Sequence, residues 1–149
     1  MASTFSTGAV AANVQARSGI GLQAVASSFT VTGGAALVLN DVIQMVKVPV
    51  GATIVEVILT STDLDTSTGI KLDVGDGNDT DRFIKQSLVG QTGGVERMGF
   101  GVLDATHLNY QYSVEDTIDV KVQTAATGTA ATTFTIGLVV IYNMQQTVV

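Results

Sequence analysis

The chain has 149 residues and a formal net charge of −6, and only 13% of its residues are charged while 46% are hydrophobic. The absence of cysteine excludes disulfides and thiolate metal sites, and the negative balance disfavours DNA or RNA, whose affinity depends on basic side chains that neutralise phosphates. Typical soluble domains carry about 25% charged residues, so the low charge indicates a surface partly covered by other chains, although threonine also suits exposed strand faces.

The first 21 residues are small and polar and show no periodicity. We expect residues 1–21 to form an extended N-terminal arm and residues 22–149 to form a single folded domain, as this length favours. The stretch up to Leu22 has Arg17 as its only charge and lacks the basic start and long apolar run of a signal peptide. The apolar run at residues 138–142 is too short to span a bilayer. We therefore expect synthesis in the cytoplasm and no membrane partner.

After the arm, apolar and polar residues alternate with a period of two, which is typical of strands with one buried face. The alternating runs are residues 24–31, 70–74, 108–114, 117–123 and 133–136. Turns rich in Gly, Asp, Asn and Thr separate the runs, and no window keeps a helical stripe. About eight short strands at this spacing predict an all-β fold, an antiparallel β-sandwich or jelly roll.

Three runs, at residues 42–46, 54–59 and 138–142, are apolar on both faces of the predicted strand. A strand that is apolar on both faces must bury both of them. A loop, the arm or a neighbouring subunit could cover the second face. Because three such strands occur in one small domain, we expect a homo-oligomer.

The sequence supplies few groups for catalysis. Its single histidine, His107, falls on the polar side of a predicted strand, where an exposed or interface position is the ordinary interpretation. The sequence has no nucleophile elbow, phosphate-binding loop or zinc-binding pair of histidines. We therefore predict that the protein is not an enzyme, has no catalytic residues and binds no cofactor.

The densest group of acids lies in and after the run at residues 70–74. The side-chain oxygens there that suit a hard cation belong to Asp73, Asp76, Asn78, Asp79 and Asp81. The spacing fails the EF-hand pattern, because Asp81 stands where glycine is required and Ser87 falls at the distal bidentate position. Two interpretations remain: a weak calcium site, and the favoured one, an Asx-type turn in which Asp and Asn side chains bond the local backbone.

Three stretches, residues 39–53, 61–65 and 72–84, follow one another as strand, Pro49-Val50-Gly51 turn, strand and acidic turn. In this they resemble the capsid decoration (cement) proteins, and similar head-associated β-sandwich proteins, of tailed bacteriophages. The resemblance implies a virion protein, made in the host cytoplasm, that binds the outer capsid surface as a homotrimer. It further implies that the protein stabilises the capsid by bridging major capsid protein subunits, and it carries over no contact residues.

Two other functions fit the same pattern. A head fibre or tail structural protein needs an oligomeric β-sandwich of the same kind. A β-sandwich carbohydrate-binding module would be supported by a calcium turn, but the chain has no tryptophan, and sugar faces stack on aromatic rings.

Overall fold

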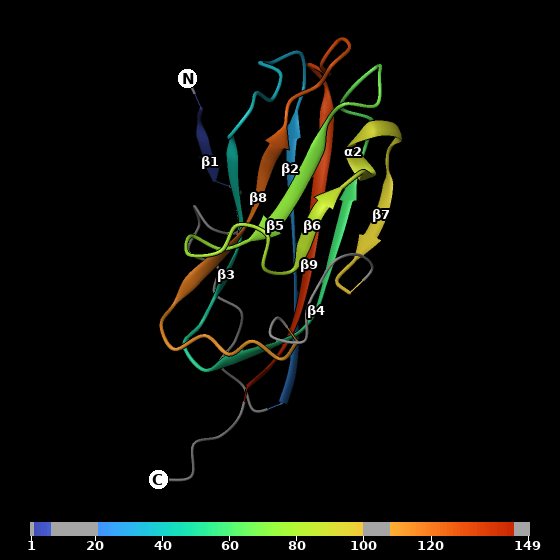
Figure 1. Cartoon of the computed structure of the whole chain (residues 1–149). Helices are drawn as coiled ribbons and strands as arrows, with labels where there is room; N and C mark the ends of the chain where they lie inside the picture. Colours follow the sequence, from blue (N-terminus) through green and yellow to red (C-terminus); the bar gives the residue numbers. More distant parts are fainter. Residues whose placement is uncertain (1, 7–20, 100–107, 145–149) are drawn as a thin grey trace, which may run out of the picture.

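The computed structural model describes residues 2–6, 21–99 and 108–144, which form two β-sheets packed face to face (Figure 1). One sheet has five strands in the order β1-β3-β8-β5-β6, and the other has four in the order β2-β9-β4-β7. The strands are β1 (Thr4–Ser6), β2 (Gly21–Val31), β3 (Val42–Val48), β4 (Ala52–Ser61), β5 (Lys71–Gly75), β6 (Ile84–Ser87), β7 (Gly94–Arg97), β8 (Asp116–Thr124) and β9 (Phe134–Met144). A four-residue helix, α2 (Val89–Thr92), precedes β7, and no helix among the described residues is long and apolar enough to cross a membrane. The predicted all-β sandwich is confirmed.

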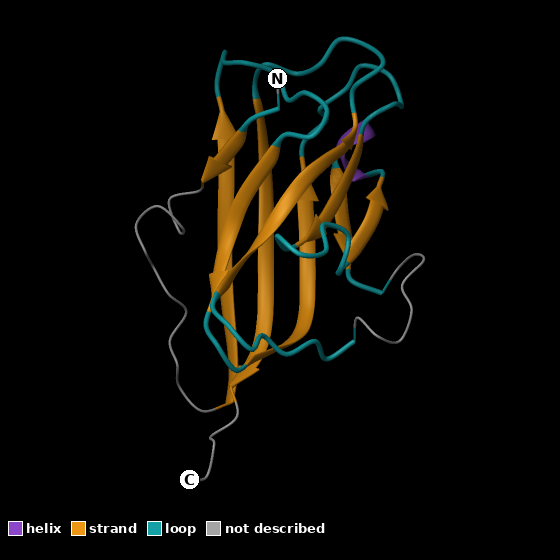
Figure 2. Ribbon diagram, turned by 60° about the vertical axis from the view of Figure 1, so that its left-hand side comes forward, coloured by secondary structure: helices purple, strands orange, loops and turns teal. Residues whose placement is uncertain are grey.

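The core lies between the two sheets and is built from alternate residues of their strands. Figure 2 shows the long strands of both layers running along the length of the molecule. Ile118, Val120 and Val122 of β8 point inward from one sheet, and Ile136 and Val140 of β9 point inward from the other. Each such side chain is fully buried, and burying one stabilises the fold by roughly 1.5–3 kcal/mol.

Two of the three runs predicted to be apolar on both faces owe part of that pattern to β-bulges. The pairing of β3 with β8 shifts between Gln44 and Val46, so Met45 and Val46 are both buried although they are adjacent. The pairing of β4 with β9 shifts between Ile54 and Glu56 in the same way. An extra residue in one strand moves the following side chains to the other face. The prediction of two apolar faces is therefore wrong for the run in β3 and holds for β9, which pairs with β2 without a shift.

The prediction of a strand at residues 108–114 is wrong, and His107, predicted on the polar side of that strand, lies outside the described residues. Asn109 adopts a left-handed conformation with φ of 57°, which interrupts an extended strand. What remains is an isolated bridge between Gln111 and Thr53. Leu108 and Val114, the predicted ends of the buried face, are exposed.

The division into an arm and a domain stays a prediction, because residues 7–20 lie outside the described part. Within the arm, β1 runs parallel to β3 at the edge of the five-stranded sheet. The Ser3 N–H donates to Asp41 at 2.6 Å, and the rings of Phe5 and Phe29 lie 5.3 Å apart. Residues 3–6 are thus attached to the sandwich by main-chain and aromatic contacts.

At one end of the sandwich, the buried carboxylate of Asp65 holds two loops together. It accepts hydrogen bonds of 2.9–3.1 Å from the N–H groups of Ser67, Gly69, Ile70, Thr127 and Gly128. Burial alone would raise the pKa of this carboxyl, but the backbone donors stabilise the anion and lower the pKa to about 2. The two loops are far apart in sequence, so this one side chain fixes their relative position.

We expect Asp65→Asn to lower the melting temperature by about 5 °C or more, because an amide presents N–H groups to backbone donors that need an acceptor. The matched control is Asp63→Asn, since Asp63 is exposed and accepts one N–H, that of Asp65. Since the folded pKa lies below the unfolded value, the stabilisation is complete above about pH 4 and is lost as the pH falls through about 2. Thermal melts of both variants between pH 2 and pH 7 measure this, and equal losses in the two would contradict it.

Candidate functional site

The acidic turn between β5 and β6 is organised around the carboxylate of Asp76, which is 1% exposed. Its Oδ1 accepts the N–H of Asn78 at 3.0 Å and that of Asp79 at 2.9 Å. The turn requires glycine at position 75, because a Cβ there would lie 2.0 Å from the carbonyl oxygen of Asp79. This is the Asx-type turn favoured by the sequence.

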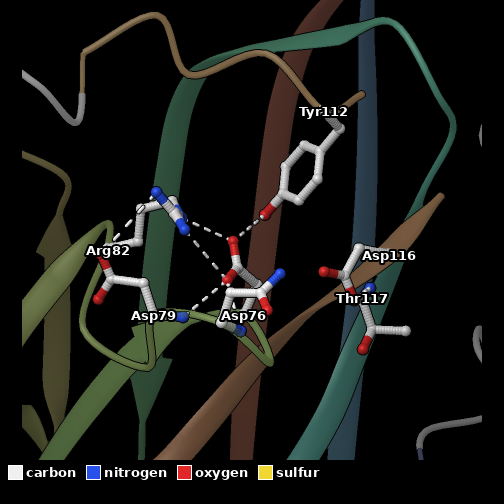
Figure 3. Close-up of polar contacts among 7 residues, drawn as sticks. Asp76, Asp79, Arg82, Tyr112, Asp116 and Thr117 are labelled. Carbon is white, nitrogen blue, oxygen red and sulfur yellow. Dashed lines mark hydrogen bonds and ion pairs between the residues drawn. The ribbon is translucent and has the colours of Figure 1, made fainter. Parts of the chain in front are cut away.

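Two side chains that the sequence analysis missed complete the surroundings of Asp76 (Figure 3). Arg82 Nε lies 2.7 Å from Asp76 Oδ2, and the hydroxyl of Tyr112 donates to the same oxygen at 3.0 Å. The guanidinium of Arg82 also lies over the ring of Tyr110, 3.8 Å from its centroid. Burial and the negative charge of Asp76 raise the pKa of Tyr112, which therefore stays a hydrogen-bond donor. The arrangement attaches the segment around residues 110–112 to the turn.

The remaining candidate residues each have a partner of their own. Asp73 is buried in β5 and accepts the N–H of Gln86 at 2.7 Å, and burial raises its pKa. Asp81 pairs with Lys85 at 2.8 Å, and the hydrogen bond from Lys85 lowers its pKa. Asp79 Oδ2 lies 3.8 Å from Arg82, while Asn78 contributes its backbone N–H to the turn.

The turn therefore neutralises its acids with Arg82, Lys85 and backbone donors. In the part of the chain that the structure describes, no group of three or more His, Asp or Glu side chains is arranged to hold a metal ion. The calcium site stays a prediction, with the melting experiment below as its test.

Asp119, in the middle of β8, adds a further acid beside this turn. Its Oδ1 is buried and has no hydrogen-bond partner among the described residues. Burial, opposed by a hydrogen bond from Thr117 and assisted by the charges of Asp116 and Asp76, raises the pKa of Asp119 to about 7. The charge on this side of the molecule therefore changes near neutral pH.

The opposite side of the sandwich differs in chemistry. The outward side chains of β2, β9, β4 and β7 form what we call the neutral face. Its centre is apolar and consists of Ala24, Ala26, Ile58, Val95, Val139 and Ile141. Its only charges are those of Glu56 and Arg97, which pair with each other at 2.7 Å. Val95 on this face is 66% exposed, and Ala24 and Ala26 are exposed as well.

The five-stranded sheet and the turns beside it carry most of the charge of the described residues. Charged residues lie on four of its five strands, at Lys47, Lys71, Asp73, Lys85, Asp116, Asp119 and Lys121. Lys47 and Glu115 form a further ion pair of 2.7 Å there. A protein whose whole surface faces water usually distributes its charged residues over all of that surface. The neutral face is therefore a candidate surface for contact with another protein.

Solved structures of three phage capsids contain chains with a similar fold. A chain of the capsid asymmetric unit of cyanophage Pam1 aligns with a TM-score of 0.67 and 25% identity, over 83% of this chain and 86% of that one. A chain of the capsid of Ralstonia phage GP4 aligns with a TM-score of 0.67 and 28% identity, over 85% and 86% of the two chains. A chain of the acid-stable capsid of Helicobacter pylori bacteriophage KHP30 shares the fold at 18% identity and a TM-score of 0.51, over 86% and 90%.

No protein-family model matches the sequence, and neither does any curated protein. The resemblance to phage head-associated structural proteins is confirmed at the level of three-dimensional structure.

We expect Arg82→Met to lower the free energy of unfolding by about 3 kcal/mol, because it leaves the buried carboxylate of Asp76 without its cation. Lys85→Met is the matched control. It removes the exposed pair with Asp81 and should cost much less, because water screens that pair. Urea denaturation measures both values, and a loss of similar size in the two variants would refute the role of Arg82.

The wild-type protein tests the alternative interpretation of the acidic turn as a calcium site. If Arg82 and backbone donors satisfy the turn, the melting temperature of the wild type should be equal in excess calcium and in excess chelator. Ligands that bind the folded state raise the melting temperature, so a clear calcium-dependent rise would establish the metal site instead.

Proposed function

We propose that this chain is a structural protein of a bacteriophage virion that self-associates and binds the outer surface of the capsid, where it bridges major capsid protein subunits. A structural role in the virion, with association with the capsid, is supported by the two capsid chains that share its fold at 25% and 28% identity. The decoration role, the outer position and the homotrimer are the further content of the proposal.

The neutral face is the observation that carries self-association. Strands are about 4.8 Å apart and rise about 3.3 Å per residue, so the four strands of this face present roughly 600 Å². Two such faces together bury about 1,200 Å², which is at the lower end of specific protein interfaces. Because Glu56 and Arg97 pair within one copy, covering the face leaves no charge without a partner. Because a homotrimer is built from heterologous contacts, the natural occupant is an adjoining surface of the next copy.

Bridging follows from multiplicity. A subunit contact with the capsid can be weak, yet an oligomer that holds several capsid subunits at once gains from effective concentration. Dissociation must then break all contacts together, which opposes separation of the capsid subunits. The charged side remains in water and keeps the particle soluble. The proposal assigns the protein no catalytic step and no cofactor.

We expect Val139→Lys to break the contact through the neutral face and to lower the mass of the assembly, because it places a charge at the centre of the neutral face, where Val139 lies between Ala26 and Ile58. The matched control is Val114→Lys, since Val114 is 62% exposed and lies outside the neutral face. Light scattering at micromolar concentration measures both masses. A wild type that is already monomeric, or a Val139→Lys variant of unchanged mass, would exclude the neutral face as the interface.

The capsid role is tested by mixing the purified protein with capsids that lack it. We expect the protein to co-sediment with the particles at a fixed number of copies and to raise the temperature at which they open. Val139→Lys should bind with lower occupancy, because it has lost the multiple attachment, while Val114→Lys should bind like the wild type. Absence of binding to intact particles would overturn the proposal and favour a fibre or tail component.

A further inference from the structure

The edges of the two sheets differ in how well they are protected. An edge strand exposes a row of unpaired N–H and C=O groups, and proteins limit this with short strands, charges, proline or bulges. Three of the four edges follow the rule. β1 has three residues, β6 has four and contains Lys85, and β7 has four and contains Glu96 and Arg97.

The fourth edge, β2, has none of these protections. It is eleven residues long, contains no charged residue and no proline, and pairs with β9 at all eleven positions without a bulge. β2 ends its sheet, and no other strand of the described residues pairs with its outer side. A regular, uncharged edge of this length is suited to accept another strand.

The sequence of β2 is compatible with pairing to itself. When two copies of the strand overlap fully in antiparallel orientation, Ala26 meets Ala26 at the centre. On the outward side, Ala24 then meets Ser28 and Leu22 meets Thr30, so no two bulky residues and no charges lie opposite each other. In this register even-numbered residues face even-numbered residues and odd-numbered residues face odd-numbered ones. The inward residues of both copies therefore stay on the core side. An isologous contact of this kind requires a two-fold axis and nothing more.

We propose that β2 pairs antiparallel with β2 of a second copy across a two-fold axis at Ala26, which joins two four-stranded sheets into one of eight strands. The β2 contact extends the sheet within its own plane, whereas a contact through the neutral face is directed along the perpendicular to that plane. The two contacts therefore use different surfaces, and one copy can make both. The inference goes beyond the proposed function and does not require binding to the capsid.

The chain has no cysteine, so a single introduced thiol reports this contact directly. Directly opposed residues of an antiparallel pair have Cα atoms about 4.5–5.5 Å apart, within the range that a disulfide spans. Ala26→Cys should therefore form a disulfide-linked dimer under mild oxidation. In the proposed register, Ala24→Cys and Ser28→Cys should each cross-link poorly alone, because identical residues are then about 13 Å apart along the strand. An equimolar mixture of these two variants should cross-link well, since residue 24 meets residue 28.

Non-reducing gels measure the rates, and we expect Ala26→Cys to react at least about tenfold faster than Ser28→Cys alone. Equal rates for all single variants, or no gain on mixing Ala24→Cys with Ser28→Cys, would overturn the pairing and leave the edge to a strand of another protein. The Ala26→Cys cross-link should persist when Val139→Lys is added. Its loss there would show that the dimer forms through the neutral face, whereas loss of capsid binding with an intact cross-link would refute only the proposed function.

Discussion

The structure depends on one strand, β9, which pairs with a neighbour along both of its edges. Phe134–Met144 meets β2 at every position and β4 along most of its length. Its inward residues fill the core, while Val139 and Ile141 face outward. Because the register toward β2 has no shift, the outer edge of β2 stays regular. A close approach reinforces the pairing with β4, since a Cβ at Gly137 would lie 2.5 Å from the Thr60 hydroxyl oxygen. The neutral face and the open edge are both consequences of this strand.

The two sheets differ in the charge that they present outward. Only 13% of the residues are charged, yet most charges of the described residues lie on or beside the five-stranded sheet. There they balance one another locally, as in the pair of Arg82 with Asp76 and the pair of Lys47 with Glu115. Concentrating charge on one side keeps that side hydrated and lowers the free energy that desolvation of the other side requires. The low overall charge therefore reflects the composition of the neutral face more than a low charge density over the whole surface.

The sequence predicted the strands wherever alternation alone decides them, as in β2, β5, β8 and β9. It failed where one backbone conformation overrides the pattern. Asn109 turns left-handed and ends the strand expected at residues 108–114, and the bulge at Met45 imitates a second apolar face. The acidic turn could be recognised from its Asp, Asn and Gly residues. Its contact with Tyr112 could not, because that residue lies 36 positions from Asp76 and only the folded topology brings the two together.

A sandwich with one open edge and one neutral face has two directions in which to associate. Edge pairing extends a sheet within its own plane, and face packing stacks sheets along the perpendicular. Contacts in different directions do not compete, so a copy that makes one keeps the surface for the other. Each contact alone is small, and cooperation among several determines whether the assembly persists. Under the proposed function, such a subunit is held firmly only where an ordered array presents several partners at once.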